Sequence, residues 1–222
     1  EMSRQQLVYR LLASDTEISN TRLRSGRLNT IEWSKLHDSI ERLSKLPVFI
    51  DDIPNITIFE IRTKIRKLKL EHGDIGVIII DYLQLMSSSN KNKSEGRVQE
   101  ISEITRGLKA IAKELNIPVI ALSQLSRQVE QRDDHKPQLA DLRESGSIEQ
   151  DADVVMFVYR EGYYLQRKEP REATVEHAEW QAKMNEVAHL AQIIIGKQRH
   201  GPIGNVTLEF EERFTKFKDT QT

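Results

Sequence analysis

The sequence predicts an α/β fold whose sheet is mostly parallel and is flanked by helices. Three apolar runs indicate the strands, and they lie at Gly76–Asp81, Pro118–Ser123 and Asp153–Tyr159. Strands that are apolar at almost every position are typical of sheets buried on both faces. Segments with helical spacing separate these runs, and that alternation is typical of βαβ units.

The predicted helices follow from apolar spacing and capping residues. Thr30 is predicted to cap the helix Ile31–Leu46, and Pro47 is predicted to end it. Thr57 and Glu60 form a capping box for the helix Thr57–Leu70, which Gly73 closes. The helices are expected at Met2–Ala13, Ile31–Leu46, Thr57–Leu70, Val98–Leu115 and Ala173–Ala188.

The remaining segments complete a single predicted domain over residues 1–222. Short strands are expected at Val48–Ile50 and Ala191–Lys197, and an antiparallel hairpin at Gly204–Phe217. Ser87–Gly96 reads as a mobile polar loop. Residues 160–190 are charged and carry no motif that we can interpret. His177 and His189 lie twelve positions apart, so a helix surface is expected there and not a metal site.

Composition excludes several classes of function. The chain has 33 Lys and Arg against 34 Asp and Glu, a formal net charge of -1, and it has no cysteine. Thiolate metal sites and cysteine nucleophiles are therefore excluded, and any nucleic-acid contact must come from a local basic cluster. The longest apolar run, Val154–Tyr159, is too short to span a membrane. A cytoplasmic protein is expected, because the lack of cysteine fits a reducing compartment.

Asp81 is the first candidate site residue. It follows four apolar residues, so its carboxylate is expected at the C-terminal end of a parallel strand, where ligands bind in open α/β sheets. In phosphate-loop NTPases such an Asp holds Mg²⁺, usually through water. The alternative is that Asp81 caps the next turn.

Gln124 is the second candidate. It follows the strand Pro118–Leu122 and is expected near the same crevice as Asp81. An amide at that place can hydrogen-bond a γ-phosphate, although a polar residue at a strand end needs no such role.

Two further stretches carry charged groups that suit phosphate. In Asp141–Asp153, Arg143 offers a planar fork, and Ser145 with Gly146 could form a tight turn whose amides face an anion. Taken alone, the stretch is an acidic connector before a strand. In Gly196–Gly204, Lys197 and Arg199 leave one face of a strand end, where they could reach a neighbouring subunit's nucleotide. The alternative there is a solvated hairpin edge.

The order of these motifs carries a resemblance. IIIDYLQLM, ALSQLSR, DLRESGSIEQDADVV and KQRHGPIG follow one another along the chain. In that order they resemble the DnaB family of bacterial replicative DNA helicases over nearly the whole chain. The resemblance implies a RecA-like motor domain that works as a hexameric ring, hydrolyses ATP with Mg²⁺, and moves 5′ to 3′ on single-stranded DNA.

The resemblance also implies a role for each candidate residue. Glu1 matches the catalytic glutamate that polarises water, Asp81 the Walker B aspartate, and Gln124 the phosphate-contacting glutamine. Lys197 and Arg199 match the pair that reaches the neighbouring subunit's site. The loop that touches the DNA backbone corresponds to Arg143, Glu144 and Gly146. Primase and a helicase loader are implied as partners of the full-length protein.

One departure from the family pattern bears on activity. The 222 residues contain no G-x-x-x-x-G-K-[ST] motif, so the phosphate-binding loop and its strand are absent from the sequence. Glu1 at the front, in place of Met, indicates part of a longer chain. This chain alone is therefore expected neither to hydrolyse ATP nor to unwind DNA.

Two rival interpretations remain open on the sequence. A RecA-type recombinase or repair ATPase would share Asp81 and Gln124 but should lack the string RESGSIEQDAD. A non-catalytic binding module would keep the fold without the chemistry, although retention of Glu1, Asp81, Gln124 and Arg199 disfavours this interpretation.

Overall fold

The structure is a computed structural model that describes residues 2–88 and 96–220. Its contacts divide the chain into two compact units. The first consists of Glu1–Asp52, Arg160–Ile193 and Val206–Thr222, and the second of Ile53–Tyr159 and Ile194–Asn205. The assignment of residues 1–222 to one domain stays a prediction.

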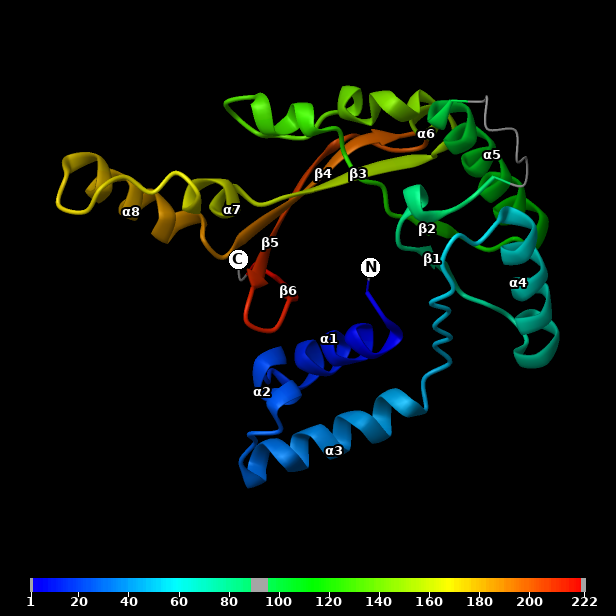
Figure 1. Ribbon diagram of the computed structural model, residues 1–222, viewed down its shortest axis with the longest axis horizontal. Helices are drawn as coiled ribbons and strands as arrows, with labels where there is room; N and C mark the ends of the chain where they lie inside the picture. Colours follow the sequence, from blue (N-terminus) through cyan, green and yellow to red (C-terminus); the bar gives the residue numbers. More distant parts are fainter. Residues whose placement is uncertain (1, 89–95, 221–222) are drawn as a thin grey trace. The chain divides into compact units, whose positions relative to one another are not determined.

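The first unit is mainly helical (Figure 1). Leu12, Ala13, Ile18 and Leu23 form its buried cluster, and apolar residues of the third helix pack against them. The elements of this unit are α1 (Arg4–Thr16), α2 (Asn20–Ser25), α3 (Thr30–Ser44), α7 (Glu161–Gln166), α8 (Val175–Val187) and β6 (Lys216–Asp219).

The second unit contains the segments that carry the candidate residues. Its elements are α4 (Ile58–His72), β1 (Ile78–Ile80), the 3-10 helix η1 (Leu83–Leu85), α5 (Arg97–Leu115), β2 (Val119–Ala121), the 3-10 helices η2 (Arg127–Gln131) and η3 (Leu139–Ser145), α6 (Gly146–Asp151) and β3 (Val154–Tyr159). The strands β4 (Leu190–Gln198) and β5 (Gly204–Glu211) have residues in both units.

The strands form two sheets. β1 and β2 are parallel, with Ile78 opposite Val119 and Ile80 opposite Ala121. The second sheet has the order β3-β4-β5-β6, and its last two strands are antiparallel. The α/β class, with parallel strands and a C-terminal hairpin, is confirmed.

Helix α5 builds the core of the second unit. Its buried residues recur at helical spacing, and Ile104 and Ile111 are fully inaccessible to solvent. They pack with Ile61 and Ile65 of α4 and with Leu83 of η1. This packing fixes the segment that leaves β1, and therefore the position of the backbone next to Asp81.

Burial of the strands differs from the prediction. We expected β1, β2 and β3 to be buried on both faces, but Ile79 is 64% exposed and Ile120 is 47% exposed. In β3 the residues alternate, so that Val155 and Phe157 are buried while Met156 and Val158 are exposed. A continuous apolar run shows only that each side chain favours burial. It does not show which face of the strand is covered by another element among the described residues.

Two local predictions were wrong. Val48–Ile50 forms no strand. The cap of α3 is Asn29, whose side chain accepts from the Glu32 amide while the Glu32 carboxylate accepts from the Asn29 amide. The capping box of Thr57 and Glu60 on α4 is confirmed, and so is the closure of α4 at Gly73.

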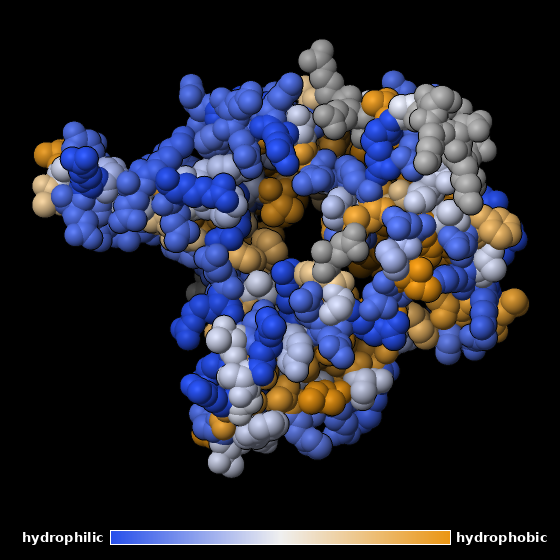
Figure 2. All heavy atoms as spheres, viewed as in Figure 1, coloured by the Kyte–Doolittle hydropathy of each residue, from blue (hydrophilic) through white to orange (hydrophobic). Residues whose placement is uncertain are grey.

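The charged stretch between β3 and β4 contains α7 and α8. Trp180 donates its indole N–H to the Leu165 carbonyl at 2.8 Å, which ties the two helices together. No described residue of α8 is buried, and the surface over α7 and α8 is mostly hydrophilic (Figure 2). The helix expected at Ala173–Ala188 is confirmed as α8. Across the described residues, no helix has the length and apolar character that crossing a membrane requires.

Candidate functional site

Asp81 and Gln124 follow the carboxyl ends of two paired parallel strands. Ile80 is opposite Ala121, and the Leu122 amide donates to the Ile80 carbonyl at 2.9 Å. The Leu83 amide donates in turn to the Leu122 carbonyl at 2.9 Å, so hydrogen bonds continue past the strand ends. Both candidate residues are exposed, and their side chains can therefore meet a ligand at this edge.

The Gln84 side chain connects the two strand ends. Its amide nitrogen donates to the Ser123 hydroxyl at 3.1 Å, and its amide oxygen accepts from the Gln124 backbone N–H at 3.2 Å. These bonds fix the backbone that carries Gln124. The sequence analysis overlooked Gln84, although a polar residue between Leu83 and Leu85, three positions after Asp81, was the available signal.

The strand-end residues suit Mg²⁺ bound with a nucleotide rather than a metal held by protein alone. No group of three or more His, Cys, Asp or Glu capable of holding a metal occurs among residues 2–88 and 96–220. Mg²⁺ keeps several waters and takes one or two carboxylates together with substrate phosphates. An exposed Asp81 carboxylate fits that mode of binding.

Lys197 and Arg199 both bind the carboxyl end of α6. The Lys197 ammonium donates to the Glu149 carbonyl and, at 2.9 Å, to the Ala152 carbonyl. The Arg199 Nη2 donates to the Gln150 carbonyl at 2.7 Å, and its Nη1 lies 3.4 Å from Asp153 Oδ1. The last carbonyls of a helix lack partners within the helix, and its carboxyl end attracts cations.

These two cations differ from buried structural charges. The Arg199 side chain is 44% exposed, and Lys197 is partly exposed. Asp153, which Arg199 faces, also pairs with Lys109; hydrogen bonding from Lys109, opposed by desolvation, holds the pKa of Asp153 below its usual value. Lys197 is the second-last residue of β4 and Arg199 directly follows the strand, so both lie at the strand end that the sequence predicts.

The stretch Asp141–Asp153 folds as two short helices. Gly146 has helical backbone angles and begins α6, so the tight turn expected at Ser145 and Gly146 is a junction between helices. Arg143 and Glu144 lie in η3, and their side chains fall outside the described part of the structure. Glu1 also lies outside the described residues.

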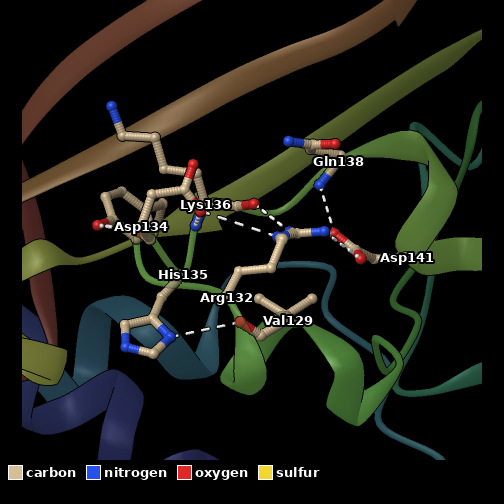
Figure 3. Close-up of polar contacts among 8 residues, drawn as sticks. Val129, Arg132, Asp134, His135, Lys136, Gln138 and Asp141 are labelled. Carbon is tan, nitrogen blue, oxygen red and sulfur yellow. Dashed lines mark hydrogen bonds and ion pairs between the residues drawn. The ribbon is translucent and has the colours of Figure 1, made fainter.

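Arg132 and Asp141 form an ion pair that the sequence analysis did not predict (Figure 3). Arg132 Nη1 and Nη2 lie 2.8 and 2.7 Å from the two carboxylate oxygens of Asp141. The stretch that contains Arg132 lacks periodicity, so no spacing in the sequence matches this arginine with an aspartate nine positions away. Asp141 belongs to the first turn of η3, so the pair ties that turn to Arg132 at the C-cap of η2.

Comparison with known proteins identifies the family. The family model described as the DnaB-like helicase C-terminal domain matches residues 1–219. The replicative DNA helicase DnaB of Rickettsia typhi is 57% identical over 217 residues, which are 98% of this chain and 43% of that protein. The replicative DNA helicase DnaB of Geobacillus stearothermophilus is 49% identical over 217 residues, which are 98% of this chain and 44% of that protein.

A solved structure agrees with these sequence matches. It is described as a DnaB-like replicative helicase and its interactions with primase, and it superposes with a TM-score of 0.85 at 36% identity. The match covers 100% of this chain and 49% of the solved chain. The chain thus spans less than half the length of the two curated relatives. Because the family model and these relatives match almost the whole chain, the chain belongs to the DnaB-like helicase C-terminal domain family.

Proposed function

We propose that this chain is part of the ATP-driven motor of a replicative DNA helicase. The motor moves 5′ to 3′ on single-stranded DNA as a hexameric ring and unwinds the duplex at the replication fork. One observation carries the proposal: Asp81 and Gln124 follow the carboxyl ends of two paired parallel strands, one and three positions after the last residue pair, Ile80 and Ala121. Ligands of open α/β sheets bind at that edge.

The residues at the strand ends have distinct roles in the proposal. Bound Mg²⁺ with ATP supplies charge neutralisation at the phosphates. Asp81 holds the ion through water, and Gln124 contacts the γ-phosphate. Glu1 polarises the attacking water, and Gln84 holds the backbone of Gln124 in place through the bond described above.

Lys197 and Arg199 act on the nucleotide of a neighbouring subunit. An arginine supplied in this way stabilises the charge that develops during phosphoryl transfer. Their bonds to backbone carbonyls support the proposal, because neutral acceptors release a cation more readily than a buried carboxylate does. The exposure of the Arg199 side chain supports it too.

Arg143, Glu144 and Gly146 contact the backbone of single-stranded DNA in the ring channel. Contacts of this kind give binding that depends on salt and not on sequence, which a chain of net charge -1 can achieve with a local cluster. Primase and a helicase loader are the proposed partners of the full-length protein, and the cytoplasm is its proposed compartment.

ATP hydrolysis by the full-length protein tests the proposal. We expect Asp81→Asn to lower kcat by at least about a hundredfold, because Mg²⁺ loses its charged partner. Asp74→Asn is the matched control, since Asp74 is 97% exposed and precedes the same strand. Asp81→Asn protein that hydrolyses ATP as fast as the Asp74→Asn control would contradict the proposal.

The chain alone provides a second test. Its 222 residues contain no phosphate-binding loop, so we expect no hydrolysis of ATP by the isolated chain. Normal turnover by the purified chain would show that nucleotide is bound by residues outside this scheme.

A further inference from the structure

The segment between β2 and α6 has little regular structure to hold it. It consists of the 3-10 helices η2 and η3 and the connection between them. Short 3-10 helices have poor hydrogen-bond geometry and seldom persist without support. The conformation of this segment therefore depends on side-chain bonds.

Three of those side-chain bonds come from Arg132. It is the C-cap residue of η2, and its guanidinium binds both carboxylate oxygens of Asp141 while also donating to the Lys136 carbonyl. The Asp141 carboxylate accepts the Gln138 amide at 2.7 Å, and the Asp141 carbonyl accepts the Ser126 amide at 3.0 Å. One ion pair thus joins both 3-10 helices and the connection between them (Figure 3).

The geometry of this pair makes it specific. The Asp141 side chain is 3% exposed, so its charge needs a fixed partner. A planar fork that meets both oxygens is a geometry that Lys cannot reproduce. Burial raises the pKa of Asp141, but the bonds from Arg132 and the Gln138 amide outweigh that effect, and the net pKa is below its ordinary value.

Leu142, the residue after Asp141, is positioned together with it. Leu142 is buried against Val155 and Phe157 of β3. On the other side, α6 is held by Lys197 at its carboxyl end and by the Thr105 hydroxyl, which donates to Asp151 at 2.6 Å. Residues 143–146 therefore lie between two anchored points, of which the first depends on Arg132.

We infer that Arg132 is a positioning residue for DNA binding. By clamping Asp141 it holds the backbone of η3 in the conformation that presents residues 143–146 to the phosphates of single-stranded DNA. The inference rests on the proposed role of Arg143, Glu144 and Gly146. Arg132 itself touches no phosphate in this scheme, because Nη1 and Nη2 are both bound within the segment.

The salt dependence of DNA binding separates positioning from direct contact. If Arg132 only sets the fraction of protein in the competent conformation, its loss raises the apparent Kd by a constant factor. The contacts of the bound state remain, so the slope of log K against log salt is unchanged. A lost phosphate contact lowers the magnitude of that slope by about 0.7 for a single strand.

The experiment measures binding of fluorescein-labelled oligothymidylate to the full-length protein by anisotropy across a salt series. We expect Arg132→Gln to raise Kd about tenfold with an unchanged salt slope, and Arg132→Lys to restore part of the affinity. Arg143→Ala should raise Kd and reduce the slope. Arg66→Gln is the matched control, because it breaks an exposed pair between α4 and α5 in the same unit.

Hydrogen exchange of the free protein checks the physical cause. In Arg132→Gln, faster exchange should be confined to the amides of η2, η3 and the start of α6. Faster exchange throughout the second unit would reduce Arg132 to a general stabilising residue and overturn the inference, and so would a reduced salt slope.

The outcomes separate this inference from the proposed function. If Arg143→Ala weakens binding while Arg132→Gln behaves like Arg66→Gln, the positioning role is wrong and the DNA-binding loop stands. If the unsubstituted full-length protein binds no oligothymidylate, or Arg143→Ala binds like the unsubstituted protein, the proposed DNA-binding loop fails and the inference fails with it.

Discussion

Two sets of cations in the second unit are held in opposite ways. Arg132 is bound by a buried carboxylate through both of its terminal nitrogens. Lys197 and Arg199 are bound mainly by neutral carbonyls at the end of α6, and the carboxylate that Arg199 faces is 53% exposed. A buried carboxylate left without its partner is costly, whereas a carbonyl at a helix end can return to water.

This difference indicates which cations can move. Arg132 must stay in place, because its departure would leave the Asp141 charge buried and unpaired. Lys197 and Arg199 can leave their carbonyls at small cost, which their proposed role toward a neighbouring subunit requires. The two sets therefore suit permanent positioning and reversible contact, respectively.

The largest expected effect is that of replacing Arg199 on the rate of ATP hydrolysis. Arg199→Ala in the full-length protein should lower ATP hydrolysis by about 10³-fold, the lower end of the range for an arginine supplied in trans. Its effect on the free energy of unfolding should stay below about 1 kcal/mol, because its ion pair is exposed. Steady-state hydrolysis and urea unfolding give the two numbers.

Lys109→Ala is the control for that prediction. Lys109 pairs with the same Asp153 from α5 but has no part in the proposed site. Equal rates of hydrolysis for Arg199→Ala and Lys109→Ala would show that Arg199 serves only its own chain.

Replacement of Arg132 should have the largest effect on stability. Arg132→Met leaves the Asp141 carboxylate buried without a counter-charge, and we expect a loss of about 3 kcal/mol in the free energy of unfolding. Arg66→Met, whose partner Glu114 is 35% exposed, should cost less than about 1 kcal/mol. Urea midpoints that rank the two variants the other way round would break the comparison.

Lys197→Met should cost less than Arg132→Met, although the substituted residue is the same. It frees two carbonyls at the end of α6 and removes a favourable charge, which together amount to about 1 kcal/mol. Thermal unfolding of both variants measures the difference. A larger loss for Lys197→Met would mean that Lys197 is a fixed structural cation.

The smallest effect is expected in acid. The pKa of Asp141 is lowered from 3.8 on folding, so its charge stabilises the folded state above that value. The contribution is lost as the pH falls through the folded pKa. Asp141→Asn should therefore show a shallower loss of stability in that range, measured by urea unfolding at several pH values. Identical acid profiles would contradict the prediction, because they would show that the pKa of Asp141 does not change on folding.

The periodicity of the sequence predicted the helices well. The stripe of α5 and the capping box of α4 appear where the spacing indicated them, because both are set by residues three or four positions apart. The positions of the strands could be predicted from the sequence, but their burial could not. Whether Ile79 and Met156 are exposed depends on whether an element elsewhere in the chain covers them. Val48–Ile50 has strand propensity but forms no strand.

The same distinction between local and long-range features applies to the candidate site. The placement of Asp81, Gln124, Lys197 and Arg199 at strand ends could be predicted, because it needs only the end of an apolar run and the geometry of a parallel sheet. Two other features could not be predicted: the hydrogen bond from Gln84 to Ser123, and the binding of Lys197 to the carboxyl end of α6. Each joins residues more than thirty positions apart.

The sequence by itself determined the family, the order of helices and strands, and the residues that end each strand. Local spacing encodes these features, so they can be predicted without knowing which distant residues come into contact. Only the tertiary structure decided that Arg132 is bound to Asp141 and that the two basic residues rest on the end of α6. Such pairings depend on which distant groups share a buried space, and no pattern along a single chain records that.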